Sequence, residues 1–297
     1  MHRQIWLFIV LTAVGAAALS AQALSVAYVQ GSVQANDGSG WSEVSIGDTI
    51  PGGATVRLGD GSYVEMTASG VDITLSQAGS YPVASLLSTS RRMGGTATSA
   101  VLTTALAALV GKTPATHSTA MGVRSENMGA ALGPAWVTSD SQVYLDAGKD
   151  FLKAGSYAKA VEQLQSALAE ASDQEIPEVK YYLATAYSLS GNEAKALGEI
   201  ADVAPSEGDS WAPDFALLKA RLLIDSFAFK QAASLLQSSS ADLAHNAQRA
   251  PAYYFLLGLA YRGIGDASNE KQNLTMVTQI AAGSDLAQAA GKLLADM

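Results

Sequence analysis

The sequence predicts a two-domain α+β chain, in which a β-rich N-terminal domain precedes an all-α array of helical hairpins. Two observations support this prediction. Between residues 24 and 84, short apolar stretches alternate with a period of two and are separated by glycine-rich turns, which is typical of antiparallel strands. From residue 141 onward, apolar residues recur at helical spacing, and the same residue types return about every 36 residues. Such a period indicates stacked helix pairs.

The first residues, 1–23, have the pattern of a signal peptide. A short polar stretch with His2 and Arg3 precedes an apolar run from Ile5 to Ala18, and Ala21-Gln22-Ala23 provides a cleavage signal. The run is shorter than the roughly 20 residues that span a bilayer. We expect cleavage after Ala23, with an uncleaved anchor as the alternative. The expected location is the periplasm or the secreted space of a bacterial cell envelope, with no transmembrane span after cleavage.

Residues 24–84 predict a small antiparallel β-sandwich or barrel. Thr55–Leu58, Tyr63–Met66 and Val71–Leu75 are short β-type stretches, and Gly59-Asp60-Gly61-Ser62 separates two of them as a turn. In Val71–Leu75 the apolar and polar residues alternate strictly, so the apolar side chains should all face one side of a sheet.

The order of these turns and strands resembles the FecR-type periplasmic domain, over about residues 26–125. The residues that carry this resemblance are Gly31-Ser32-Val33, Trp41, Val44, Gly47-Asp48, Ile50, Thr55-Val56, Gly59–Ser62, Val64-Glu65-Met66, Gly70–Leu75 and the closing segment Thr119–Arg124. Ser125 stands where the family usually has glycine. The resemblance implies a non-catalytic module at 24–126 that senses a signal or binds envelope material, without a defined ligand.

A connector interrupts the β pattern. We expect a helical insertion at about 85–112 that packs against its own β domain, with a membrane-surface helix as the alternative. One face of this helix would carry Val101, Leu102, Ala105, Leu106, Leu109 and Val110. Residues 127–140 are small and polar and predict an interdomain linker.

Residues 141–297 predict about four helical hairpins and a terminal helix. Small residues return at spacings of 36, 36 and 38 residues, and large residues follow three positions later. Small residues allow two helices to cross closely, and large ones fill the space beside the crossing. Any amphipathic bundle shows part of this spacing, but here several residue types recur together. The two series are Gly148, Ala184, Ala220, Gly258 and Phe151, Tyr187, Leu223, Tyr261.

This pattern resembles the tetratricopeptide repeat (TPR). The matching positions are Tyr144, Ala147, Gly148, Phe151, Gly155, Tyr157, Ala160, Leu164 and Ala167, then Leu183, Ala184, Tyr187, Gly191, Ala196 and Ile200, then Ala220, Leu223, Phe229, Ala232 and Leu236, then Tyr254, Leu257, Gly258, Tyr261 and Gly265. Phe227 replaces the turn glycine of the third hairpin. Glu270 replaces an alanine of the fourth hairpin, so the pattern does not decide whether this hairpin has a second helix.

The TPR resemblance implies a concave face that binds a protein or peptide. It places six residues on or near this face: Lys149, Tyr181, Thr185, Arg221, Phe255 and Arg262. Three cations and two aromatic rings suit a peptide segment or terminus that carries a carboxylate. In the alternative interpretation, the rings pack between hairpins and the cations are scattered surface charges.

Composition excludes several classes of site. The chain has no cysteine, and His117 and His245 are the histidines that remain after signal removal, in different expected domains. Disulfides, thiol nucleophiles and multi-histidine metal sites are therefore not expected. A net charge of −9 argues against a nucleic-acid partner. We expect no catalytic residues, metal or cofactor, although an enzyme that uses carboxylates alone stays open.

These observations predict a non-catalytic periplasmic interaction or scaffold protein. The β domain would contact an envelope component, and the solenoid groove would bind a protein partner. The alternative is an envelope-sensing regulator of the FecR type that passes a signal to a membrane protein.

Overall fold

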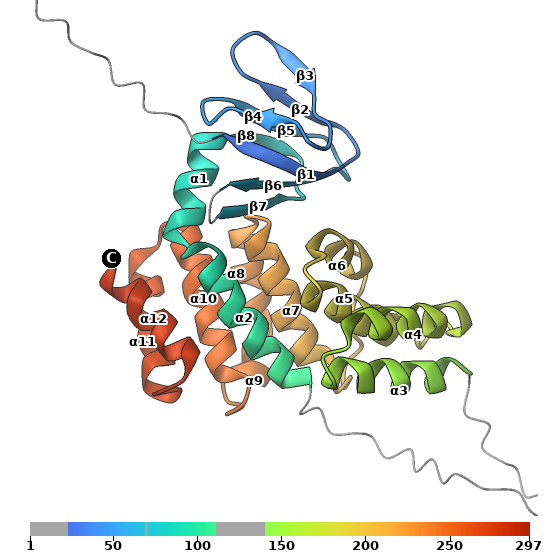
Figure 1. Cartoon of the computed structure of the whole chain (residues 1–297). Coiled ribbons are helices and arrows are strands. Elements are labelled where there is room, and N and C mark those ends of the chain that lie inside the picture. Colours follow the sequence, from blue (N-terminus) through green and yellow to red (C-terminus); the bar gives the residue numbers. More distant parts are fainter. Residues whose placement is uncertain (1–22, 69–70, 111–139) are drawn as a thin grey trace, which may run out of the picture.

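The computed structural model describes residues 23–68, 71–110 and 140–297. The predicted signal segment up to residue 22, the closing segment of the FecR-like pattern and most of the predicted linker lie outside the described residues. A β-sandwich sits on top of an array of helices, and two helices connect them (Figure 1). Among the residues that the structure describes, no helix is long and apolar enough to cross a membrane.

The N-terminal part is a sandwich of two four-stranded antiparallel sheets, in the orders β4-β1-β6-β7 and β3-β2-β5-β8. This confirms the predicted antiparallel β region. The strands are β1 (Leu24–Gln30), β2 (Val33–Asn36), β3 (Trp41–Glu43), β4 (Thr49–Ile50), β5 (Thr55–Leu58), β6 (Tyr63–Ala68), β7 (Val71–Leu75) and β8 (Gly79–Pro82).

The alternation in β7 has the predicted effect. Val71, Ile73 and Leu75 are buried in the sandwich core, whereas Asp72 between them is exposed. Because successive side chains of a strand point to opposite faces, the second face of β7 is free to meet another part of the chain. That face is directed toward the helices (Figure 1).

Two helices lead from the sandwich to the array. Helix α1 (Val83–Arg92) contributes Leu86 and Leu87 to the sandwich core. Helix α2 (Gly95–Val110) behaves differently: Leu102, Leu106 and Leu109 are buried in the core of the helical array. The expectation that the insertion at about 85–112 packs against its own domain is therefore wrong for α2. The helical array offers α2 a continuous apolar surface, and α2 also touches β7 at the junction.

The C-terminal part contains four helical hairpins, a short helix and a terminal helix. The hairpins pair α3 with α4, α5 with α6, α7 with α8 and α10 with α11. The helices are α3 (Asp140–Lys153), α4 (Tyr157–Glu170), α5 (Ile176–Leu189), α6 (Glu193–Ile200), α7 (Ala212–Asp225), α8 (Phe229–Ser238), α9 (Ser240–Leu243), α10 (Ala250–Ile264), α11 (Ala267–Ile280) and α12 (Asp285–Ala295).

Glycine in the first helix of a hairpin allows a close crossing. A Cβ atom on Gly148 would lie 2.6 Å from Cγ of Leu164, and one on Gly258 would lie 2.6 Å from Cδ2 of Leu274. Both leucines lie sixteen residues after their glycine and are fully buried. Each leucine therefore fills the space that the missing side chain leaves.

Two departures from the repeat pattern have structural explanations. Phe227, in place of a turn glycine, adopts the left-handed conformation with φ of 62°, and its ring packs against the sandwich core. Glu270 is buried in α11 and pairs with Arg262 of α10, whose guanidinium also donates to the carbonyl of Leu293 in α12 at 3.1 Å. The fourth hairpin thus has a second helix, and its buried ion pair holds the terminal helix.

The crossings lead to a first prediction. Gly148→Ala should lower the free energy of unfolding by about 1–3 kcal/mol, because the added methyl overpacks Leu164. Gly198→Ala in α6 is the matched control, since a Cβ there meets nothing within 4 Å. The control should stabilise by about 0.5–1 kcal/mol, as alanine favours helix over glycine. Urea unfolding of both variants measures the difference, and equal effects would contradict the assigned crossing.

Candidate functional site

The face of the helical array that the first helices of the hairpins form is occupied by a helix of the same chain. Helix α2 contacts α3, α5, α7 and α10, which are the first helices of the four hairpins, and it also contacts α12. Figure 1 shows α2 running across these helices. The surface that the TPR resemblance assigns to a partner is thus covered along its length by residues 95–110.

The buried face of α2 is a row of leucines. Leu102, Leu106 and Leu109 are 1%, 7% and 8% exposed, and they share one apolar cluster with residues of α7 and α10 such as Leu217 and Leu256. The spacing of four and three residues places all three leucines on one face of the helix. This is the geometry by which an amphipathic helix lies in an apolar groove.

The six residues predicted to line the groove do not form an open surface. Five of them are buried, with exposures between 0% and 7%: Tyr181, Thr185, Arg221, Phe255 and Arg262. Each of the three predicted cations already has a carboxylate partner: Lys149 pairs with Glu178, Arg221 with Glu193 and Asp225, and Arg262 with Glu270. The structure therefore does not assemble the six as a free receptor for a peptide carboxylate.

The aromatic rings pack between hairpins, as the alternative interpretation stated. Tyr181 of α5 stacks on Trp211, which precedes α7, with ring centroids 5.5 Å apart. Burial raises the pKa of the Tyr181 phenol well above its usual value, so the phenol stays neutral. The ammonium of Lys149 lies 4.6 Å from the centroid of Tyr182, so this cation is held from two sides.

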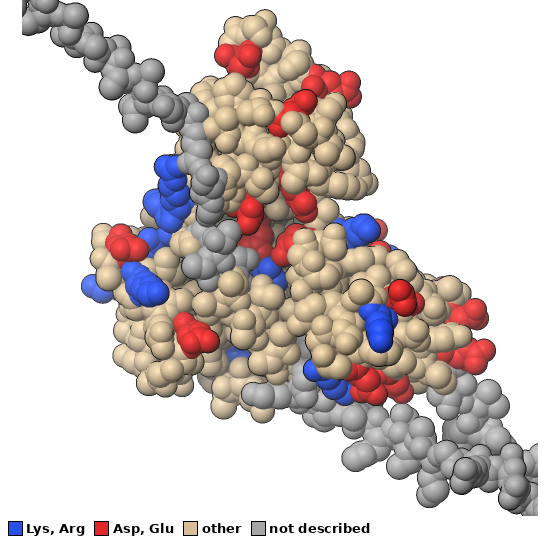
Figure 2. All heavy atoms as spheres, in the orientation of Figure 1, with Lys and Arg blue, Asp and Glu red and all other residues tan. Residues whose placement is uncertain are grey.

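A recess lies where the sandwich, α2 and the array meet. Its volume is about 370 Å³, which is within the usual range of small-molecule sites. Acidic residues gather between the upper and lower parts of the molecule (Figure 2). The lining residues are Glu65, Met66, Thr67, Asp72, Ile73, Thr74, Ser90, Met93, Thr98, Leu102, Gly191, Glu193, Ile224, Asp225, Phe227, Phe229 and Leu259.

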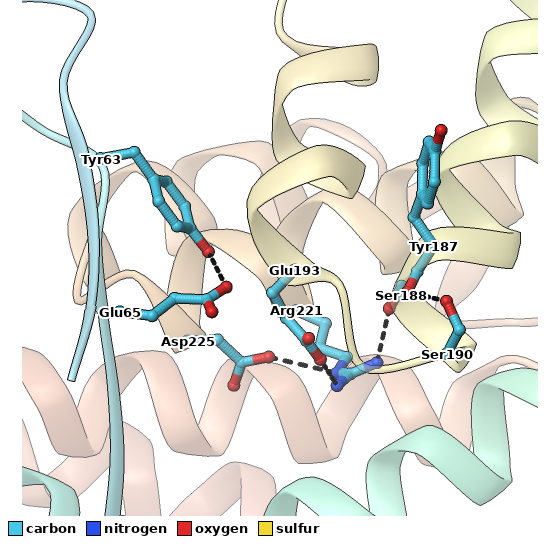
Figure 3. A network of polar contacts seen from close by, with 8 residues as sticks. All are labelled: Tyr63, Glu65, Tyr187, Ser188, Ser190, Glu193, Arg221 and Asp225. Carbon is cyan, nitrogen blue, oxygen red and sulfur yellow. Dashed lines mark hydrogen bonds and ion pairs between the residues drawn. The ribbon is translucent and has the colours of Figure 1, made fainter. Parts of the chain in front are cut away.

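A buried arginine supports the acidic wall of this recess from behind. Arg221 of α7 contacts Glu193 at 2.9 Å and Asp225 at 3.2 Å, and it donates to the Ser188 hydroxyl at 2.8 Å (Figure 3). Burial raises the pKa of both carboxyl groups, and the positive charge of Arg221 opposes this rise. One guanidinium thus holds two carboxylates and joins three helices, α5, α6 and α7.

The sandwich contributes the other two carboxylates. Glu65 of β6 accepts a hydrogen bond from the Tyr63 hydroxyl at 2.7 Å (Figure 3). The negative charge of Glu65 also contributes to raising the pKa of Glu193, so the two parts of the chain influence each other electrostatically. Asp72 on the outer face of β7 completes the set.

The recess was not predicted from the sequence. Glu65, Asp72, Glu193 and Asp225 come from four elements in two parts of the chain, and no spacing connects them. One local feature of the sequence pointed to this junction. Phe227 stands where the other hairpins have a turn glycine, and it is the residue that contacts the sandwich core. In the described parts of the chain, no group of three or more acidic residues or histidines is arranged to hold a metal ion. No lining residue is a lysine, cysteine or histidine.

Comparisons with known proteins show a distant structural likeness. No family model matches the sequence, and no curated protein matches it. The solved structure of MamA, residue 41 to the end, from Desulfovibrio magneticus RS-1 is 19% identical, with a TM-score of 0.43, and covers 54% of this chain and 86% of that chain. The MamA RS-1 ArsTM double mutant is 16% identical, with a TM-score of 0.40, and covers 54% of this chain and 94% of that chain.

The buried arginine leads to a second prediction. Arg221→Met should lower the free energy of unfolding by about 3–5 kcal/mol, because Glu193 and Asp225 lose their counterion in a buried place. Lys153→Met is the control, since Lys153 pairs with an exposed Asp150 at 3.3 Å and should lose less than about 1 kcal/mol. Thermal and urea unfolding measure both. A loss of stability in Arg221→Met as small as in the control would contradict a structural role for this network.

Proposed function

We propose that this protein is a non-catalytic interaction scaffold whose helical array binds an amphipathic helix. The observation that carries the proposal is the position of α2, which lies along the first helices of all four hairpins and buries three leucines there. A groove that receives a helix of its own chain in this way has the shape and chemistry to receive a similar helix from a partner.

The chemistry of α2 describes the partner. Residues 95–110 carry no charged side chain, and small residues separate the leucines. The three cations predicted for the groove, Lys149, Arg221 and Arg262, are each paired with a carboxylate of the array. A partner helix with leucines at positions i, i+4 and i+7 therefore suits the groove better than the carboxylate-bearing peptide that the residue pattern had favoured. Partner and α2 would compete for the same surface.

The proposed location is the periplasm or the secreted space of a bacterial envelope. Its support is the signal-like pattern at residues 1–23 and the order of turns and strands that resembles the FecR-type domain. In this proposal the sandwich contacts an envelope component and the array holds a protein beside it. The resemblance to TPR proteins agrees with the hairpin architecture.

A sensing regulator of the FecR type is the second candidate. The observation that favours it is the shared junction, since Phe227 of the array packs on the sandwich core and α2 reaches β7. A change at the sandwich would then alter the seating of α2 and so the accessibility of the groove. Deletion of the gene followed by transcript measurement separates this role from a scaffold, because a scaffold leaves transcription unchanged.

The third prediction tests the groove with the variant Leu106→Asp. A charge at this buried position should detach α2, because an unpaired carboxylate cannot be accommodated in an apolar cluster. A labelled peptide of residues 95–110 should then bind the variant at least about tenfold more tightly than it binds the parent, in which the tethered helix competes at high effective concentration. Fluorescence anisotropy measures the affinity.

The matched control is Ala108→Asp, which places the same charge on the exposed face of α2. The Ala108→Asp protein should bind the peptide of residues 95–110 as weakly as the parent protein does. A second peptide with serine at the three leucine positions should not bind any of the proteins. One outcome contradicts the proposal: the Leu106→Asp protein keeps its helical circular dichroism and still fails to bind the peptide of residues 95–110. In that case the groove is not a helix receptor.

A further inference from the structure

We propose that the recess between the sandwich and the array binds a small organic ammonium ion with an apolar body. The recess has an acidic wall, an apolar wall and the hydroxyl groups of two largely buried residues. These features come from β6, β7, α1, α2, α6, α7, the turn before α8, α8 and α10. This recess adjoins the groove and shares Leu102 of α2 with it.

The charge of the recess selects a cation. Four carboxylates line it, and within the described residues Arg221 is the one cation that pairs with any of them. The excess of three negative charges is concentrated in a partly enclosed space, where charges interact more strongly than in water. No lysine or arginine of the described residues forms an ion pair with Glu65 or Asp72. A ligand ammonium would supply the missing positive charge.

Two hydroxyl groups provide an independent indication of a polar ligand. Ser90 of α1 and Thr98 of α2 are 7% and 8% exposed, and both line the recess. Among the described residues neither hydroxyl forms a hydrogen bond, and neither oxygen is itself a buried atom without a partner. A hydroxyl group that forms no hydrogen bond within the chain is free to bond a polar group of a ligand. A ligand ammonium, with three donors, can satisfy a hydroxyl as well as a carboxylate.

The opposite wall accepts an apolar body. Phe227 and Phe229 lie edge to face with centroids 5.7 Å apart, and Met93, Leu102 and Leu259 extend this side. An ammonium close to the phenylalanine rings would gain cation–π attraction as well. Phe227 keeps a left-handed backbone, which is unfavourable for a bulky residue and is found mainly where a function maintains it.

An inorganic cation fits less well. The described residues contain no arrangement of three or more ligating side chains for a metal ion, and about half of the lining residues are apolar. Hard cations such as Ca²⁺ need six to eight oxygen ligands around one point. Burial raises the pKa of Glu193 and Asp225, and an ammonium ion beside them would favour their charged form.

The fourth prediction tests the recess by isothermal titration calorimetry on the full mature chain. The probe is 2-phenylethylamine, and 2-phenylethanol is the neutral molecule of similar shape. The amine should bind at least about tenfold more tightly than the alcohol, because the alcohol cannot neutralise the carboxylates. The double variant Glu65→Gln/Asp72→Asn should weaken amine binding by about tenfold or more. It leaves Arg221 and its two partners in place.

Two further variants keep the test decisive. Glu43→Gln/Asp60→Asn removes two exposed carboxylates of the sandwich outside the recess and should bind the amine like the parent. Thr98→Val removes one hydroxyl of the recess lining at nearly constant volume. It should weaken binding severalfold even if the double variant fails to fold.

The proposal is overturned by any of four results with folded protein. These are equal binding of amine and alcohol, unchanged binding in both recess variants, an equal loss in the Glu43/Asp60 control, and no heat of binding at millimolar amine. Displacement of the amine by millimolar CaCl₂ at constant ionic strength would identify a general counterion site and would also overturn it.

Discussion

The contact between α2 and the first helices of the hairpins is the interaction on which the rest of the structure depends. Three leucines of α2 are almost fully buried there, and each such burial stabilises by about 1.5–3 kcal/mol. Without this contact the first helices of the hairpins would expose the apolar residues that now surround these leucines, and large exposed apolar patches are uncommon. With it, the chain places its β-sandwich on top of the array, against α6 and α7, and closes the junction between them.

The polar junction follows from this placement. Because α2 is seated on the array and α1 on the sandwich, β6 and β7 are brought opposite α6 and α7. Carboxylates from the two sides then face one space, and a single buried guanidinium supports two of them. Such an arrangement is costly for folding, since burying charges without full pairing is unfavourable. These incompletely paired carboxylates lie next to the unusual backbone conformation of Phe227. Unfavourable features of this kind cluster at functional sites, which is the physical reason for proposing a ligand in the recess.

The groove and the recess share a structural element. Thr98 and Leu102 of α2 line the recess, while Leu106 and Leu109 extend along the array. A ligand in the recess would therefore stabilise the seated position of α2, by the general rule that a ligand favours the conformation that binds it. Through this linkage a small cation would reduce the affinity of the groove for a partner helix, and the partner would reduce the affinity for the cation equally.

Local periodicity could be interpreted from the residues alone. The period of two in Val71–Leu75 gave the strand and its buried face, and the recurrence from Gly148 to Gly258 gave the hairpin crossings, because backbone geometry turns such spacings directly into faces. Three other features were decided by the tertiary structure. They are the surface against which α2 packs, the burial of Arg221, and the proximity of Glu65 and Asp72 to Glu193 and Asp225. An amphipathic helix shows that it has an apolar face but not which surface will cover it, and charges distant in sequence become neighbours through long-range packing alone.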